Sequence, residues 1–341
     1  IYNIRGRFSV KWTDHTLHPG WGWRAVAWWK NGADWVQLDS QWVDWEGKFF
    51  LTANTPGYTG QNLRVQFRSY NRFFEPRDED DHTFRWKNPD KNNIAADHDE
   101  GHRWADCDGT DTNGLGEVHF RAYQLWSRMH WDAGINALRA NPIVVYYPNT
   151  SYDCGNGDGV PWSCANTAGT LWLIPKHGTN RGTVQHELGH QINYEFWNNK
   201  RPPNAGGSHN AAKCNTKGLA LMEGYANFVP IWVQTNRSAV PDAGIRPYDT
   251  EDPSGACKTP GTTNEAWVAA TFWDLHDSHA DGDDVIWFKK LGAVHKIFFQ
   301  HGPANDGDAL AIDDFRTFYR DAASDGHESY IDDIFTQNDT D

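Results

Sequence analysis

The first 85 residues alternate between hydrophobic and polar positions with a period of two. Residues 7–12 run Arg-Phe-Ser-Val-Lys-Trp, and residues 63–68 run Leu-Arg-Val-Gln-Phe-Arg. This period is typical of half-buried antiparallel strands. Turn signals separate the runs, in the segments 18–20, 31–32, 46–47 and 56–57. The pattern predicts a small antiparallel β-sandwich over residues 1–85.

A different periodicity follows a segment rich in charge, Pro and Asn at about residues 75–95, which we interpret as a linker. Hydrophobic residues then recur every three or four positions, which predicts helices. The expected helices cover residues 117–136, 183–198, 220–234, 264–277, 284–301 and 308–323. Runs of β-branched and aromatic residues predict buried strands at 143–147 and 171–174. Residues 86–341 are therefore expected to form an α+β domain.

Composition supports two parts of different character. The net charge is -14, yet residues 1–85 hold 11 Lys or Arg against 10 Asp or Glu, so the acidity belongs to the second part. Eight of the 19 tryptophans lie in the first 50 residues. An acidic chain of pI near 5.5 is not a general nucleic-acid binder, and no apolar run reaches the roughly 20 residues of a membrane helix. We expect neither nucleic acid nor membrane as a partner.

The five cysteines favour an extracellular protein. Cys154 and Cys164 flank a short Gly-rich loop, the spacing of a disulfide-closed loop. Cys214 and Cys257 form a second candidate pair, which leaves Cys107 unpaired, although four cysteines permit three pairings. Three Asn-x-Ser/Thr sequons add weak support for secretion, at Asn149, Asn236 and Asn338.

The strongest chemical signal is the motif His-Glu-x-x-His at residues 186–190. On a helix, His186 and His190 project from one face, and their ring nitrogens can share a metal ion. Glu187 stands beside that ion, where a base can take a proton from water. Gly189 lies in mid-helix at a cost of about 1 kcal/mol relative to Ala, which indicates close approach of another backbone. A chance motif on a solvated helix is the alternative interpretation.

The third ligand separates the classes of zinc peptidase that use this motif. Metzincins have Gly and His where this chain has Asn193 and Phe196, and the Gly-Thr-x-x-Asp pattern of aspzincins is missing. Residues 221–227, Leu-Met-Glu-Gly-Tyr-Ala-Asn, resemble the Glu-Gly-x-Ala pattern of gluzincins. Glu223 follows His190 by 33 residues, enough for a loop to bring a second helix against the first.

The chain thus resembles gluzincin-type zinc metallopeptidases at residues 183–193 and 221–227. The resemblance implies a zincin-like fold in which His186, His190 and Glu223 bind Zn²⁺. It also implies that Glu187 activates water and then protonates the leaving amine. Where some gluzincins have an Asp that orients the first His, this chain has Asn227, a neutral and therefore weaker partner.

Other residues are candidates for the remaining roles. Tyr225, Tyr194 and His276 are candidate donors to the oxyanion of the tetrahedral intermediate, with His276 ranked first and core packing as the alternative for Tyr225. His209, in a Gly-rich loop, is interpreted as a solvated residue rather than a metal ligand. Strand 171–174 is expected to be an edge strand that pairs with an extended substrate.

Two acidic segments leave a second metal open. Residues 277–284 have Asp at the first and fifth positions of a calcium loop but lack its final Glu, so they form either an irregular Ca²⁺ loop or a helix cap. The same alternatives hold for residues 97–111. Ca²⁺ is therefore the second cofactor considered.

The leading hypothesis is a secreted zinc endopeptidase acting on proteins or glycoproteins. It has a β-sandwich, with a segment at 44–49 that resembles transthyretin-like or carboxypeptidase-regulatory-like domains, followed by the zincin-like domain. The alternative is a secreted carbohydrate-binding or adhesive protein with an inactive zincin-like scaffold, whose N-terminal tryptophans contact glycans. The intact His186, Glu187, His190 and Glu223 favour the enzyme, because a scaffold needs no water-activating Glu.

Overall fold

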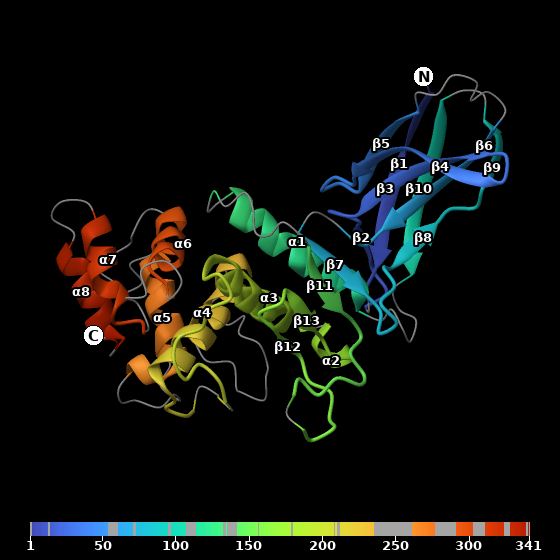
Figure 1. The fold of residues 1–341 in the computed structure, drawn as a ribbon. Helices are drawn as coiled ribbons and strands as arrows, with labels where there is room; N and C mark the ends of the chain where they lie inside the picture. Colours follow the sequence, from blue (N-terminus) through green and yellow to red (C-terminus); the bar gives the residue numbers. More distant parts are fainter. Residues whose placement is uncertain are drawn as a thin grey trace. The chain divides into compact units, whose positions relative to one another are not determined.

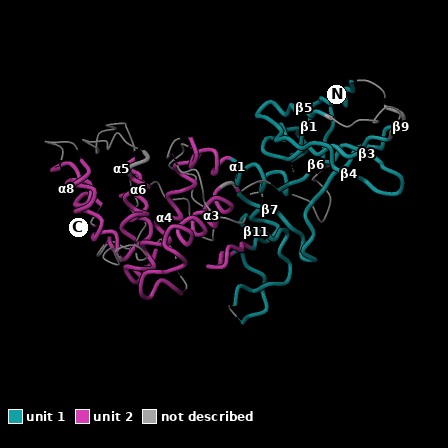
Figure 2. Tube along the Cα trace, turned by 45° about the horizontal axis from the view of Figure 1, so that its top comes forward, with its two compact units in different colours: residues 1–123, 141–163, 172–179 teal, residues 124–140, 164–171, 180–341 magenta. Residues whose placement is uncertain are grey.

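The structure of the protein is a computed structural model that forms two compact units (Figure 2). The first unit contains residues 1–123, 141–163 and 172–179, and the second contains residues 124–140, 164–171 and 180–341. The residues described are 2–12, 14–53, 61–70, 73–94, 97–106, 114–131, 134, 142–155, 157–178, 180–207, 209, 212–234, 261–276, 291–302, 311–323, 328–338 and 340.

The first unit is built mainly of strands (Figure 1). One sheet has the order β10-β1-β2, with β5 also paired to β1, and another has the order β4-β3-β6-β8, with β9 also paired to β6. Their bounds are β1 Tyr2–Lys11, β2 Leu17–Pro19, β3 Arg24–Asn31, β4 Asp34–Trp42, β5 Lys48–Ala53, β6 Gln61–Arg68, β8 Arg85–Lys87, β9 Lys91–Ile94 and β10 His98–Asp106. The alternating sequence pattern is thus realised as strands.

The aromatic side chains at alternate positions form the core of this unit. Phe8 of β1 stacks on Phe67 of β6 with ring centroids 3.9 Å apart, and Phe49 of β5 meets the same Phe67 ring edge-on at 5.3 Å. All three are at most 4% exposed. Each sheet therefore contributes inward-facing aromatic rings, as the period of two requires.

The prediction of a linker at residues 75–95 is wrong, because this segment forms strands. Residues 75–95 contain most of β7 (Phe74–Arg77) together with β8 and β9, and β10 pairs in parallel with β1. Residues up to 123 belong to the first unit. These strands carry many charged side chains, which hid them from the periodicity argument, but backbone pairing with β6 and β1 does not depend on apolar side chains.

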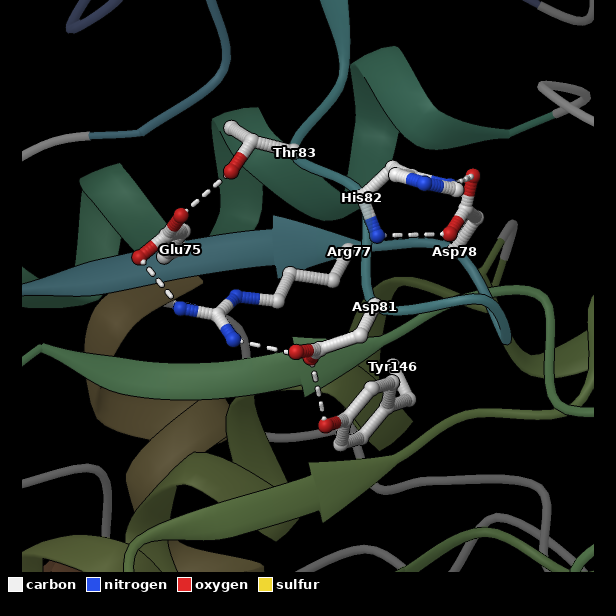
Figure 3. A network of polar contacts seen from close by, with 7 residues as sticks. All are labelled: Glu75, Arg77, Asp78, Asp81, His82, Thr83 and Tyr146. Atoms are coloured by element: carbon white, nitrogen blue, oxygen red, sulfur yellow. Dashed lines mark hydrogen bonds and ion pairs between the residues drawn. The ribbon is translucent and has the colours of Figure 1, made fainter.

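Strand β7 also pairs in parallel with β11 (Ile143–Tyr146), and a polar network joins them (Figure 3). Arg77 binds Asp81 at 2.8 Å and Glu75 at 3.1 Å, and Tyr146 donates its hydroxyl proton to Asp81 at 2.8 Å. Hydrogen bonds from Arg77 and Tyr146, only partly opposed by burial, lower the pKa of Asp81. The network fixes the hairpin after β7 against β11.

The second unit is mainly helical (Figure 1). Its elements are β12 Cys164–Ala165, α3 Arg181–Phe196, α4 Lys217–Gln234, the 3₁₀ helix η1 Gly261–Thr263, α5 Glu265–His276, α6 Leu291–Gln300, α7 Phe315–Ala322 and α8 Glu328–Gln337. The division between the units falls within α1 (Leu115–Trp131) and β13 (Thr170–Trp172), and the short α2 (Pro175–Gly178) belongs to the first unit. The helix periodicity predicted α1 and α3 to α7; it missed α2 and α8.

Two glycines set the spacing of the central helices. A Cβ on Gly189 of α3 would lie 3.2 Å from the Ala226 Cα of α4, and a Cβ on Gly224 of α4 would lie 2.5 Å from Val268 of α5. The close backbone approach predicted from Gly189 is confirmed. The Glu-Gly-x-Ala motif therefore has a packing role: its Gly faces α5 and its Ala faces α3.

The cysteines and sequons give mixed results. Cys154, Cys164 and Cys214 are disulfide-bonded, whereas Cys107 and Cys257 lie outside the described residues, as does Asn236. Asn149 and Asn338 are 2% and 3% exposed, and their amide nitrogens donate to protein oxygens. Two of the three sequons are thus structural amides and lend no support to secretion. Within the described part of the chain, no helix is both long and apolar enough to cross a bilayer.

Candidate metal centre

Capping residues in the sequence fix where the site-bearing helices begin. Asn180 caps α3 by accepting hydrogen bonds from the amides of Gly182 and Thr183. The Thr216 hydroxyl accepts from the amide of Leu219 at the start of α4, and Asn264 accepts from the amide of Ala266 at the start of α5. These caps set the register of α3 and α4, and they place Glu265 at the first position of α5.

Helices α3 and α4 bring His186, His190 and Glu223 together, and we call these three the metal-ligand group. The Glu223 Oε2 lies 3.3 Å from the His186 Nε2 and 3.2 Å from the His190 Nε2. One potential ligand atom from each residue lies within 4.8 Å of the others, and all three residues are buried. Among the described residues, a search for three or more His, Cys, Asp or Glu side chains close enough to hold one ion finds this group.

The spacing of these atoms fits a metal ion. Ligands at about 2.0 to 2.1 Å from a tetrahedral ion stand roughly 3.3 Å apart, which matches the two distances to Glu223. The Glu223 Oε2, which faces both Nε2 atoms, is buried without a hydrogen-bond partner. Two imidazoles and one carboxylate are the donor set of a catalytic zinc site, so the residues fit Zn²⁺.

Electrostatics keep Glu223 in the form that binds a cation. Burial by itself raises the pKa of Glu223, but the nearby imidazoles of His190, His209 and His186 outweigh it and hold the pKa well below its ordinary value. The carboxylate is therefore ionised at neutral pH, as a metal ligand must be.

Glu187 has the surroundings of a general base. It is 8% exposed, and burial raises its pKa to about 7, with Glu223 adding to the effect and His186 and His209 opposing it. A base works best when its pKa lies near the working pH. The position after His186 thus combines proximity to the metal-ligand group with a suitable pKa.

His209 corrects the sequence analysis, which interpreted it as a solvated loop residue. Its Nδ1 lies 2.7 Å from the Glu265 Oε2, and its Nε2 lies 3.5 Å from the Glu223 Oε1. Burial lowers the pKa of His209, but Glu223 and Glu265 outweigh burial and raise it to about 9. His209 is therefore a cation next to the metal-ligand group.

The loop that carries His209 is tied to the start of α5. The Asn215 amide donates to the Thr263 carbonyl at 2.7 Å, and the Asn264 side chain donates to the Lys213 carbonyl at 3.0 Å. Cys214, between these anchors, is disulfide-bonded. Two sequence signals bear on the position of His209: the capping residue Asn264 and the nearby Cys214. Neither signal predicts Glu265 as the partner of His209.

The other oxyanion candidates lie in different places. Tyr225 is 0% exposed and its hydroxyl bonds the His295 Nδ1 at 3.0 Å, so it is a core residue. His276 packs against the rings of Phe228 and Trp232, within the same aromatic cluster as His295. The interpretation of Tyr225 as an oxyanion donor is therefore replaced by its packing alternative.

Tyr194, by contrast, lies beside the site. Its ring is nearly parallel to that of His190, with centroids 6.3 Å apart, and Arg201 covers it at 4.8 Å. Burial raises the pKa of Tyr194 to about 12, Arg201 opposes this, and the carboxylates of Glu223 and Glu187 add to it. A protonated phenol thus stands close to both glutamates.

Two supporting expectations are not met. The Nδ1 of His186 has no hydrogen-bond partner, so Asn227 does not orient this imidazole, although Asn227 is buried on α4. Strand β13 pairs with β12, so the outer strand there is β12. Gln191 of α3 donates to the carbonyls of Asn166 and Thr170, which ties the β12–β13 turn to the helix of the His pair.

The acidic residues 97–100 bind protein donors. Asp97 accepts hydrogen bonds from Asn3, Asp99 from the Gly101 amide, and Glu100 from Asn88. Asp108 and Asp111 of the same acidic segment lie outside the described residues, so the choice between a calcium loop and a cap stays open there. Residues 277–284 lie outside the described part of the chain.

Comparison with known proteins identifies the family. The model of the mycolysin C-terminal domain matches residues 126–330. The chain belongs to this family. The match to the mycolysin C-terminal domain contains all three residues of the metal-ligand group as well as Glu187, His209 and Glu265. Membership fits a peptidase, and the strands from β1 to β10 precede the matched region.

The other comparisons add nothing to the mycolysin C-terminal domain match. No curated protein matches the chain. Among solved structures, a 9R-lipoxygenase from Cyanothece PCC8801 is similar over 36% of this chain and 22% of that enzyme, at 12% identity and a TM-score of 0.21. A likeness this slight carries no information on fold or activity.

Proposed function

We propose that this protein is a secreted, zinc-dependent endopeptidase of the gluzincin type. The observation that carries the proposal is the pair of distances from the Glu223 Oε2 to the His186 and His190 Nε2 atoms, 3.3 and 3.2 Å, with Glu187 next in sequence to His186. Membership in the mycolysin C-terminal domain family supports a peptidase, and the disulfide-bonded cysteines support an oxidising compartment.

The residues divide the chemistry between them. Zinc, when bound by the metal-ligand group, supplies the Lewis acidity that makes water easier to deprotonate. Glu187 takes the proton from the attacking water and gives it to the leaving amine. With a pKa of about 7, it can do both at neutral pH.

His209 is the proposed donor to the oxyanion of the tetrahedral intermediate. Its Nε2 faces the Glu223 Oε1, whereas the His pair shares Oε2, so His209 approaches the site from another side. Glu265, 1% exposed, holds the opposite ring nitrogen, and the charges of Glu223 and Glu265 together keep the imidazole cationic. A fixed cation directed at developing negative charge is a strong source of catalysis. Tyr194 is the second candidate donor.

The alternative, a carbohydrate-binding protein with an inactive zincin-like scaffold, does not account for this arrangement. A scaffold gains nothing from a buried Glu187 whose pKa is raised, or from a buried Glu265 that orients His209. We therefore rank the enzyme first.

Chelation tests the proposal. The protein should cut casein at internal bonds, lose that activity in 1,10-phenanthroline, and recover it with one equivalent of Zn²⁺. Mass spectrometry of the fragments shows whether cleavage is internal. Hydrolysis that survives removal of zinc, or no hydrolysis of any protein by the zinc-loaded chain, contradicts the proposal.

A further inference from the structure

A pocket of about 690 Å³ opens on the first unit, formed by β1, β5, β10 and the end of β4. Two large hydrophobic side chains line it in exposed positions: Trp42 is 43% exposed and Phe50 is 54% exposed. The remaining lining side chains are mostly charged or polar. The pocket thus offers flat aromatic surfaces beside hydrogen-bonding groups.

Strand register explains why these side chains gather on one face. Arg5 of β1 lies opposite Phe50 of β5, and Arg7 lies opposite Lys48. Residues two apart on a strand share a face, so these four side chains share the solvent side of the sheet. Between Arg5 and Arg7 the pairing with β10 shifts by one residue at Gly101, which has a φ of +67°.

Three cations (Arg5, Arg7 and Lys48) and two carboxylates (Asp44 and Asp99) line the pocket, so one positive charge is in excess. Arg5 pairs with Asp99 at 3.3 Å, and Lys48 pairs with Glu46. Arg7, however, has no ion-pair partner among the described residues. It stands directly across the strand pair from Lys48, and like charges in that relation repel each other. Because Lys48 is already paired with Glu46, the group that lacks a counter-ion is Arg7, and an anion bound beside Arg7 would supply one, although the chain as a whole is acidic.

We propose that this pocket binds an acidic saccharide. The carboxylate or sulfate of the sugar lies between Arg7 and Lys48, where a guanidinium offers a bidentate fork. The C–H face of the sugar ring packs on Trp42 and Phe50, and the ring hydroxyls meet Gln41 and Asp99. Flat exposed aromatic rings suit a sugar better than an aliphatic peptide side chain, which needs an enclosed apolar cavity. This site does not depend on the proposed peptidase activity.

Calorimetric titration of the full chain tests the site with four probes. These are sialyllactose, its neutral parent lactose, a heparin-derived sulfated tetrasaccharide, and a hexaglutamate peptide. We expect at least one acidic saccharide to bind with a Kd below about 1 mM, at least tenfold more tightly than lactose. Tighter binding of sialyllactose would indicate that the pocket recognises a carboxylate, and tighter binding of the sulfated tetrasaccharide would indicate that it recognises a sulfate. Equal binding of lactose, equal binding of hexaglutamate, or no binding of either acidic sugar overturns the proposal.

Matched variants locate the site. Arg7→Gln and Trp42→Ala should each weaken binding of the acidic saccharide by at least tenfold, and the circular dichroism spectrum shows whether each variant is folded. Arg85→Gln, which alters an exposed cation outside the pocket, and Trp45→Ala, whose side chain is 70% exposed but does not line the pocket, should change the Kd by less than twofold. If Trp42→Ala does not fold, Phe50→Ala replaces it. Unchanged binding by Arg7→Gln contradicts the assignment.

Discussion

The imidazole of His209 lies 2.7 Å from the buried carboxylate of Glu265, 56 residues later in the chain. This contact holds the ring in place, and Glu223 and Glu265 together raise its pKa, so a loop histidine becomes a fixed cation facing Glu223. Removal of the imidazole in His209→Gln should lower kcat by about 10²-fold with little change in KM, because the interaction is made in the transition state. The zinc content should stay at one per chain.

Glu265→Gln separates orientation from charge. The Gln oxygen can still accept a hydrogen bond from His209, so we expect a smaller loss, about tenfold in kcat. Without the Glu265 charge the pKa of His209 falls from about 9, so the alkaline limb of the pH–rate profile should move to lower pH. Gly206→Ala is the loop control, since a Cβ there meets nothing within 4 Å. Loss of zinc from His209→Gln would show that His209 is a metal ligand. An alkaline limb that does not move in Glu265→Gln would contradict the role of Glu265 in raising the pKa of His209.

The glycines between the helices should differ in their tolerance of a methyl group. In Gly224→Ala the new Cβ would stand 2.5 Å from Val268, so overpacking of about 1 to 3 kcal/mol exceeds the helix-propensity gain of up to about 1 kcal/mol. The Tm should fall. Gly189→Ala, with its nearest contact at 3.2 Å, should change the Tm less.

Calorimetric melting of both variants, with Gly206→Ala as the unhindered control, checks this order. A Gly224→Ala protein that melts with the wild type would show that α4 and α5 can separate without cost.

Buried His119 predicts a loss of stability in acid. It is 0% exposed between Trp23 and Phe74, neither ring nitrogen has a hydrogen-bond partner, and burial lowers its pKa to about 3. In the unfolded chain His119 takes up a proton near pH 6.5, whereas in the folded protein it stays neutral until about pH 3. The free energy of unfolding is therefore undiminished by this group above pH 6.5 and falls as the pH drops toward 3. Between pH 6.5 and 4 the loss is on the order of 3 kcal/mol.

His119→Leu removes the group that takes up the proton, so its stability compared with that of the wild type tests this prediction. The free energy of unfolding of the variant should fall less steeply between pH 6.5 and 4, as measured by urea denaturation at several pH values. Parallel curves for the two proteins would mean that His119 is hydrated or protonated in the folded state.

The sequence was sufficient for the features that depend on local patterns. Apolar periodicity located α3 and α4, and the spacing of His186 and His190 predicted a pair of metal ligands. The resemblance of residues 221–227 to gluzincins added Glu223 to that pair. A mid-helix Gly189 predicted the close approach that the Ala226 contact realises. Each of these signals lies within one or two turns of a helix.

Features that depend on distant pairing were not predictable in this way. Strand β10 has few apolar residues and exists as a strand because β1 pairs with it, more than 90 residues earlier in the sequence. His209 acquires its charge from Glu223 and Glu265, on two different helices. The sequence around Tyr225 suits both the site and the core, and only the contact of its hydroxyl with His295 places it in the core.

The most direct test of the account is the rate of peptide hydrolysis by zinc-loaded Glu187→Gln, with the metal content measured on the same sample. The amide keeps the shape of the side chain but cannot take a proton, so the variant should hold one zinc per chain and lose at least about 10³-fold in kcat/KM. Glu195→Gln, on the same helix, is the control and should keep wild-type activity. A Glu187→Gln protein that binds zinc and retains more than a tenth of the wild-type rate would contradict the assignment of Glu187 as the base.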